Sequence, residues 1–182
     1  GSPLAQGGVD IGRVMDKCWY NEVYPIARRV CFKDPIVASK RPDLAVHSTG
    51  GGLWGNGQWL DPYSQENWDY ILGIAQEAVR KGFKEIQLDY VRFPSDGNTE
   101  TCVFPSQAAG DTREKAEVIT AFLAYMRNGL KPTGTVLSAD VFGLTASDQG
   151  SMGIGQDIAS MATQLDYLCP MVYPQTFGPG NA

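Results

Sequence analysis

The stretch F-K-E-I-Q-L-D-Y-V-R-F-P-S-D-G, residues 83–97, decides the fold. Its first half alternates polar side chains, at Glu85, Gln87 and Asp89, with apolar ones. Successive side chains of a strand point to opposite faces, so this alternation predicts a strand over 84–91 with one polar and one apolar face. A central strand of an α/β protein is normally apolar on both faces. Buried carboxylates are unfavourable unless they are paired or used, so the polar face indicates a functional site.

Asp89 stands where this strand is expected to end, just before Arg92, Pro94 and Gly97 turn the chain into a loop. Enzymes with parallel sheets place their chemistry at the C-terminal ends of the strands. Asp89 is therefore the first candidate for a catalytic residue.

The composition is that of one globular domain, which we expect to span 1–182. The chain has 182 residues, of which 43% are hydrophobic and 19% are charged. These values exclude a disordered chain and leave enough residues for a core. The net charge of −5 and the absence of a basic run argue against a nucleic-acid partner. No apolar run is long enough to cross a bilayer, and no secretion signal is recognisable.

Cofactor sites find little support in the sequence. There are four cysteines without a C-x-x-C pair and one histidine, so a zinc site of the usual Cys/His kind is not expected. Neither a G-x-G-x-x-G motif after a strand nor a G-x-x-x-x-G-K-[ST] motif is present, which argues against nucleotide binding. We expect no metal and no organic cofactor.

Hydrophobic spacing predicts four helix–strand units in a row, which is typical of a parallel sheet with right-handed crossovers. The expected strands are 24–33, 84–91, 135–141 and 167–173. The expected helices are 10–19, capped by Asp10, then 64–81, capped by Ser64, a third from Asp111 to just before Pro132, and 156–163, with a short helical turn at 36–40.

The loops of this predicted fold are unequal. Turns that enter strands are short, whereas the loops that leave them, 34–63, 92–110 and 142–155, are long. The long loops therefore lie together at the C-terminal ends of the strands. That is the geometry of a (β/α) barrel, and a doubly wound sheet would share it.

The 85–97 motif resembles the signature of a bacterial glycoside hydrolase-like (β/α) barrel family, a domain-of-unknown-function group distantly similar to α-amylase-like hydrolases. Five further segments agree with that family in order: A-R-R-V-C-F-K-D-P (27–35), W-L-D-P-Y (59–63), S-A-D-V-F-G (138–143), M-G-I-G-Q-D (152–157) and D-Y-L-C-P-M-V-Y-P (166–174). The resemblance covers nearly the whole chain and implies a TIM-type barrel. It also implies an extracellular or cell-envelope location.

The chain holds only about four of the eight β/α units of such a barrel, those around strands three to six. A four-stranded piece cannot close an eight-stranded barrel alone. We therefore expect a partial barrel that belongs to a longer protein or associates with another copy of itself.

Glycoside hydrolysis needs two carboxyl groups, one to protonate the leaving oxygen and one to attack or to activate water. Asp140 ends the strand after that of Asp89 and shares its face with Ser138. Adjacent strands lie about 4.8 Å apart, which brings two such carboxylates within the range found in glycosidases. We expect Asp89 to be the nucleophile or base and Asp140 the general acid. The resemblance places Asp89 where amylase-like enzymes carry their nucleophile. The structural alternatives are a salt bridge for Asp89 and a loop-ordering role for Asp140.

Substrate-binding candidates come from the segments expected at the same end of the sheet. Aromatic rings, including that of Trp54, can stack on sugars or lie in the core, and an aspartate before proline can bind a hydroxyl or start a turn. Arg28 or Arg29 can also keep Asp89 ionised, and Glu85 is expected to pair with an arginine of 24–33. The candidates are Arg28, Trp59, Asp61, Tyr90, Arg92 and Tyr173.

The sequence thus predicts an enzyme that hydrolyses glycosidic bonds in a carbohydrate polymer. Two alternatives remain open at this point. One is a carbohydrate-binding domain without activity on the same scaffold, and the other is an assembly role in the cell envelope.

Overall fold

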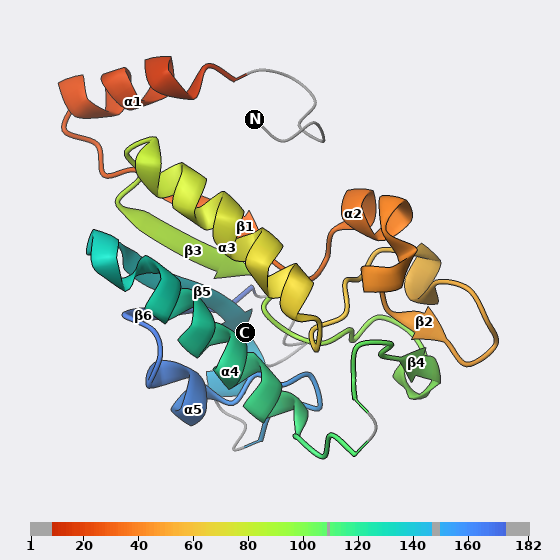
Figure 1. Cartoon of the computed structure of the whole chain (residues 1–182). Coiled ribbons are helices and arrows are strands. Elements are labelled where there is room, and N and C mark those ends of the chain that lie inside the picture. Colours follow the sequence, from red (N-terminus) through yellow and green to blue (C-terminus); the bar gives the residue numbers. More distant parts are fainter. Residues whose placement is uncertain (1–8, 109, 147–149, 174–182) are drawn as a thin grey trace.

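The protein is described by a computed structural model that covers residues 9–108, 110–146 and 150–173 (Figure 1). Its main sheet has four parallel strands in the order β1-β3-β5-β6. Their bounds are Ile26–Val30 (β1), Glu85–Asp89 (β3), Val136–Phe142 (β5) and Tyr167–Met171 (β6). The predicted parallel sheet of four units is confirmed. Strands β1, β3 and β6 are shorter than expected, whereas β5 has the expected length and is displaced by one residue.

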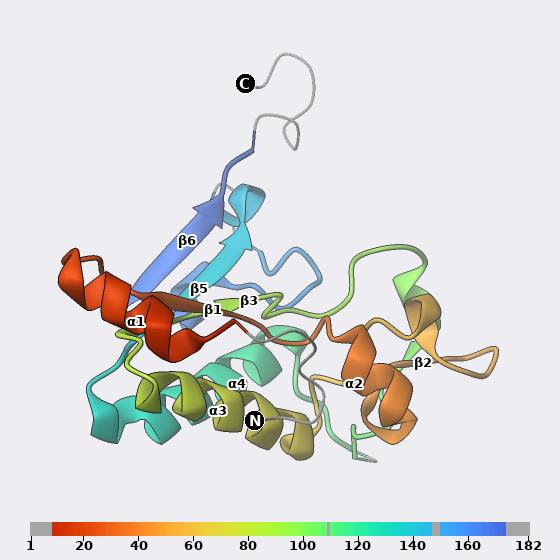
Figure 2. The ribbon, with the colours of Figure 1, turned by 90° about the horizontal axis from the view of Figure 1, so that it is seen from above.

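Helices connect these strands as the hydrophobic spacing predicts. Their bounds are Ile11–Tyr20 (α1), Pro35–Lys40 (α2), Gln65–Arg80 (α3), Lys115–Leu130 (α4) and Ile158–Ala162 (α5). The Ser64 hydroxyl caps α3 by accepting the Asn67 backbone N–H at 3.3 Å, and Asp10 caps α1 in the same way. Figure 2 shows α3 and α4 side by side under one face of the sheet.

The start of α4 corrects one prediction. Glu114, not Asp111, is the N-cap residue, and it forms the capping box with Glu117. The Asp111 carboxylate instead accepts hydrogen bonds from the backbone and guanidinium of Arg113, with Nη2 at 2.6 Å. The Asp111 carboxylate therefore binds Arg113, two residues further on, in place of the backbone N–H groups at the start of the helix.

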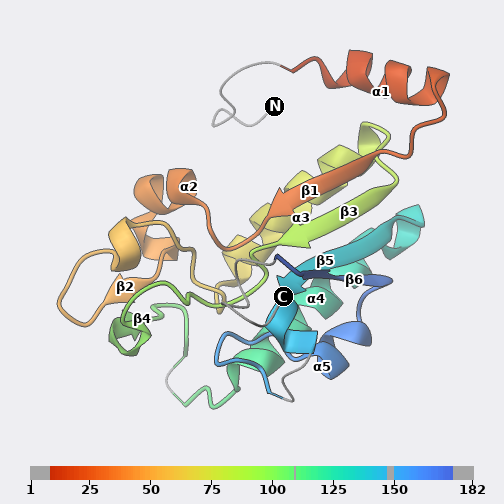
Figure 3. The ribbon, with the colours of Figure 1, turned by 180° about the vertical axis from the view of Figure 1, so that it is seen from behind.

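The long loops lie at the C-terminal ends of the strands, as predicted. Two of them meet in a small antiparallel sheet formed by β2 (His47–Ser48) and β4 (Cys102–Val103). Figure 3 shows this sheet and α2 beyond the arrowheads of β1 and β3. The sequence did not predict β2 and β4, because strands of two residues carry no periodic pattern. Short 3-10 turns complete the loops and helix ends at Pro42–Leu44, Trp54–Asn56, Thr99–Thr101, Lys131–Thr133 and Gly143–Ala146.

The two faces of the main sheet differ in chemistry. The helix-covered face packs against α3 and α4 and is almost fully shielded from solvent. It consists of Ile86, Leu88, Leu137, Ala139 and Val141, each no more than 1% exposed. The opposite face, here called the polar face, consists of Arg28, Glu85, Gln87, Asp89, Ser138 and Asp140. The alternation in 85–90 therefore separates core from polar residues as expected.

In the described residues, β1 and β6 are the two ends of an open sheet, and no closed barrel forms. This agrees with the predicted partial barrel. None of the helices in these residues combines the length and the apolar character that a membrane crossing requires.

Candidate active site

The register of the parallel strands aligns the polar face in rows. Gln87 lies opposite Arg28 of β1 on one side and Ser138 of β5 on the other. Continuing the β3–β5 register by two residues places Asp89 opposite Asp140 at the C-terminal end of the sheet. Two carboxylates therefore emerge from adjacent strands, on the same face and at the same level.

Asp89 is buried, with only 2% of the residue exposed, and both of its carboxylate oxygens accept hydrogen bonds. The Arg28 guanidinium donates to its Oδ2 atom, and the backbone N–H of Tyr90 donates to Oδ1 at 2.7 Å. Tyr90 has a φ of 49°, in the left-handed region that non-glycine residues rarely adopt. Such backbone conformations persist where the surroundings enforce them, and here the turn fixes the carboxylate orientation.

Asp140 has a different environment. Gln87 Nε2 donates to its Oδ1 atom at 2.8 Å, and Arg28 Nε lies 3.5 Å from its Oδ2 atom. Burial raises the pKa of Asp140 above its ordinary value, and the charge of Arg28 and the Gln87 hydrogen bond only partly oppose this rise. Asp140 therefore keeps its proton to a higher pH than an exposed aspartate does, as a general acid requires.

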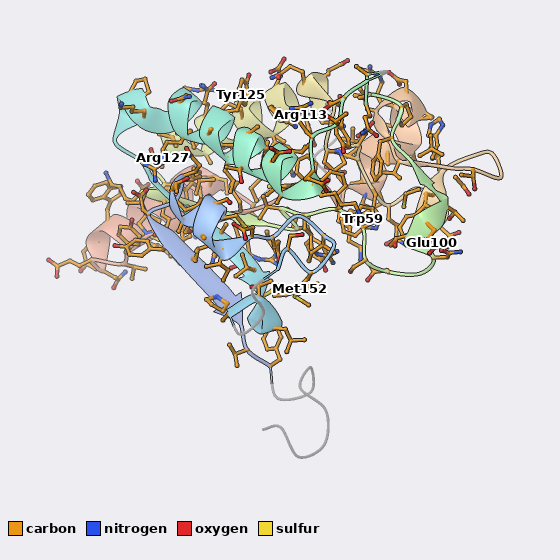
Figure 4. The ribbon with its side chains drawn as sticks, turned by 90° about the horizontal axis from the view of Figure 1, so that it is seen from below. Trp59, Glu100, Arg113, Tyr125, Arg127 and Met152 are labelled. Carbon is orange, nitrogen blue, oxygen red and sulfur yellow. The ribbon has the colours of Figure 1, made fainter. Side chains whose placement is uncertain are left out.

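A cavity of about 450 Å³ opens beside the two carboxylates. Six of the eight predicted site residues line it: Arg28, Asp89, Tyr90, Arg92, Asp140 and Tyr173. Met152 lines the same cavity, and Figure 4 shows it near the end of β5, at the opposite end of the sheet from Arg127. The cavity thus lies at the C-terminal ends of the strands, where the loop lengths predicted a site.

Arg92 lies next to this cavity inside a ring of aromatic side chains. Its guanidinium carbon is 4.7 Å from the ring centre of Phe142, 4.9 Å from that of Trp59 and 5.3 Å from that of Tyr90. These rings come from three different strand-end segments. Arg92 is 5% exposed, and burial lowers its pKa from the ordinary value. The cation is stabilised by the faces of the rings.

With this geometry in place, comparisons with known proteins give the family. A family model described as "Putative glycosyl hydrolase domain" matches residues 4–182. The chain belongs to this family. The resemblance predicted from residues 85–97 is thereby confirmed, and family and fold together are those of glycoside hydrolases. A comparison with curated proteins gave no match.

Solved structures extend the comparison within this fold. A "hypothetical protein" from Ruminiclostridium thermocellum is 40% identical, with a TM-score of 0.66 over 82% of this chain and 70% of that one. A "putative sporulation-specific glycosylase" from Bacillus subtilis is 16% identical, with a TM-score of 0.56 over 93% of this chain and 45% of that one. An α-galactosidase from Thermus thermophilus is 14% identical, with a TM-score of 0.56 over 87% of this chain and 29% of that one. The chain therefore shares the TIM-barrel type of glycosidases and spans less than half of these two enzymes.

Two predicted binding residues, Trp59 and Asp61, are not among the residues that line the cavity. Trp59 is 1% exposed and packs edge-on against Tyr90, so neither face of its ring is free for a sugar. Asp61 is 0% exposed, and its carboxylate accepts the backbone N–H groups of Tyr63 at 2.9 Å and Ser106 at 2.7 Å. Asp61 orders loops, which was the structural alternative.

Two other residues, Trp54 and Glu85, also have structural roles. Trp54 is 6% exposed, and its indole N–H donates to Asn98 O at 3.2 Å. Glu85 does not pair with an arginine as expected, because the Ser138 hydroxyl donates to its Oε1 atom at 2.5 Å.

Sequence reasoning missed several residues around the carboxylates. Gln87 was recognised as polar but not as the hydrogen-bond donor to Asp140. Gln156, 1% exposed, accepts the backbone N–H of Phe142 at 3.0 Å and so holds the end of β5. The remaining cavity residues that were missed are apolar and include Phe142, Leu144, Met152 and Met171. Only the glycines around Met152 hinted at a constrained loop, and that residue has a φ of 52°.

Within residues 9–108, 110–146 and 150–173, no group of three or more His, Cys, Asp or Glu side chains is arranged to hold a metal ion.

Proposed function

We propose that this domain hydrolyses O-glycosidic bonds of a polysaccharide and that Asp89 and Asp140 are its catalytic pair. The observation that carries the proposal is that the two carboxylates face one cavity but have different environments. Asp89 is fixed by the Arg28 guanidinium, whereas burial keeps Asp140 protonated to a higher pH. When two carboxyl groups of one site have different environments, the group that keeps its proton to higher pH acts as the acid and the ionised group acts as the nucleophile or base.

In the proposed reaction, Asp140 donates its proton to the glycosidic oxygen as the bond from this oxygen to the anomeric carbon breaks. Asp89 either attacks the anomeric carbon or removes a proton from the water that attacks it. If Asp89 attacks, a glycosyl–Asp89 ester forms; Asp140 then takes a proton from water, and the water oxygen attacks the anomeric carbon and breaks the ester, which restores both carboxyl groups. If Asp89 instead takes a proton from the attacking water, proton exchange with solvent restores both carboxyl groups. In both routes water supplies the hydroxyl of the new reducing end. Arg28 contacts both carboxylates and keeps Asp89 ionised during substrate binding.

The proposal is tested by incubating the protein with bacterial and plant polysaccharides and detecting new oligosaccharides by mass spectrometry. Wild type is expected to release products that disappear in both Asp89→Asn and Asp140→Asn. Binding that persists in Asp89→Asn would agree with this assignment. Folded wild type that binds a polysaccharide without cutting it would contradict the proposal and favour a carbohydrate-binding domain.

A further inference from the structure

The two arginines of the cavity differ in how their charge is balanced. Arg28 contacts the carboxylates of both Asp89 and Asp140. Within the described residues, Arg92 has no carboxylate within ion-pair distance, although it is 5% exposed. Buried charges are normally paired, so Arg92 is the exception that requires an explanation.

The acid closest in sequence is already engaged elsewhere. Asp96 lies 3.3 Å from Lys33 Nζ and reaches Arg92 only indirectly, through the hydroxyl of Ser95. The aromatic rings around Arg92 stabilise its positive charge without neutralising it. A net positive charge therefore remains beside the catalytic carboxylates.

The hydrogen bonds of Arg92 indicate which part of the guanidinium is available. Its Nη1 atom donates to Phe93 O at 3.0 Å and to Ser95 Oγ at 2.9 Å. In the described part of the chain, Nε and Nη2 make no such bond, and neither is among the fully buried polar atoms without a partner. Arg92 lines the cavity, so these two nitrogens have access to its contents. Together they form the side-on pair of parallel donors that matches a carboxylate.

We propose that Arg92 binds the carboxylate of an acidic sugar, which makes uronic-acid polysaccharides the substrate class of this site. The inference rests on the proposed glycoside hydrolase function and adds its specificity. The aromatic ring around Arg92 orients the guanidinium, and the carboxylate supplies the missing counter-charge. A neutral sugar would leave Arg92 buried and unpaired, which is how a polar site discriminates against a ligand without the matching group.

The experiment compares matched ligands. Oligosaccharides of polygalacturonate, alginate and hyaluronan are each prepared with their carboxylates intact and with these groups reduced to alcohols. Dissociation constants are measured by calorimetry, and cleavage is followed by mass spectrometry. Wild type is expected to bind at least one acidic oligosaccharide at least tenfold more tightly than its reduced form. Equal or weaker binding of every acidic form, or no binding to any, would overturn the proposal, as would a preference for a sulfated carrageenan oligosaccharide.

Variants of Arg92 test whether this residue carries the preference. Arg92→Gln is expected to bring the ratio of the two constants below about threefold. Arg92→Lys should retain part of the preference, because an ammonium keeps the charge but lacks the two parallel donors. It also provides the test if Arg92→Gln does not fold. Arg29→Gln is the control, since Arg29 also lies over an aromatic ring, that of Tyr70, but is not a cavity residue. Unchanged preference in both Arg92 variants would contradict the assignment.

The outcomes separate this proposal from the proposed function. Cleavage of only the reduced oligosaccharides, lost in Asp89→Asn, would support the hydrolase and overturn the role of Arg92. Selective binding of acidic oligosaccharides that are never cleaved would support the role of Arg92 and contradict the hydrolase.

Discussion

The two faces of the sheet use the same strands for different purposes. On the helix-covered face, Ile86 and Leu88 are fully buried against α3 and α4. On the polar face, Glu85, Gln87 and Asp89 of the same strand make hydrogen bonds to side chains of β1 and β5. A strand with period-two alternation can therefore carry stability on one side and chemistry on the other. Substitutions of core side chains on the helix-covered face should mainly lower stability, and substitutions at the cavity end of the polar face should mainly lower activity.

The largest effect on stability is expected from Phe122→Ala, under the helix-covered face. Phe122 is fully buried, with its ring centre 4.9 Å from that of Phe32 and 5.8 Å from that of Trp68. Removing such a ring costs about 3–5 kcal/mol of unfolding free energy. Urea denaturation measures the loss, and the hydrolysis rate per folded molecule should stay within about twofold of wild type. A large fall in that rate would mean that the two faces are not separable.

On the polar face, Arg28→Gln should reduce the hydrolysis rate by about 100-fold, which corresponds to about 2.7 kcal/mol of activation free energy. The substitution removes the cation that contacts both carboxylates. Because the charge of Arg28 lowers the pKa of Asp140, the alkaline limit of activity should also move to higher pH. Arg29→Gln, on the other face of β1, is the matched control for a pH–rate profile. Equal profiles for the two variants would contradict the account.

A smaller effect concerns stability as a function of pH. Burial raises the pKa of Asp140 in the folded protein, so its contribution to stability is complete below the unfolded pKa of about 3.9 and is lost as pH rises through the folded value. Asp140→Asn should therefore be more stable than wild type at pH 7, with a difference that shrinks in acid.

Asp157→Asn provides the control of opposite sign. Hydrogen bonds from Ser160 hold the pKa of Asp157 below its ordinary value. The stabilisation is therefore present above the unfolded pKa and is lost as pH falls through the folded pKa. This variant should be less stable than wild type at pH 7. Denaturation midpoints between pH 3 and pH 8 compare both variants, and differences of the same sign would show that burial does not dominate at Asp140.

The smallest expected effect comes from Gln87→Leu. The Gln87 amide donates to Asp140 at 2.8 Å and lowers the pKa of that carboxyl group. Without the donor, the alkaline limit of activity should move up by a fraction of a pH unit, and the maximal rate should change little. A shift to lower pH would mean that Asp140 is not the proton donor.

The catalytic candidates were predictable because strand ends obey simple rules. Asp89 and Asp140 each close a strand with a recognisable pattern, and parallel strands bring such ends together. The roles of Trp59 and Asp61 were not predictable in the same way. Both lie in the loop between β1 and α3, and their burial depends on segments distant in sequence, as the 2.7 Å bond from Ser106 to Asp61 illustrates. Loop sequences alone do not reveal such contacts.

The hydrogen-bond partners on the polar face also needed the structure. Glu85 was expected to bind an arginine of the preceding strand, yet the β3–β5 register places Ser138 in reach instead. A carboxylate predicts that a partner exists, whereas the register decides which partner it is. The hydrogen bond from Gln87 to Asp140 also depends on the register and was therefore not predicted.

A comparison of Asp89→Asn with Glu85→Gln tests whether catalysis lies at the cavity end of the polar face. Both acids lie on the same face of β3, both are less than 10% exposed, and only Asp89 lines the cavity. The measurement is the initial rate of oligosaccharide release at pH 6 for the two folded variants. We expect the rate to fall by at least about 1,000-fold in Asp89→Asn and to stay within about threefold of wild type in Glu85→Gln. Hydrolysis that survives in Asp89→Asn, or is lost equally in both variants, would contradict this expectation.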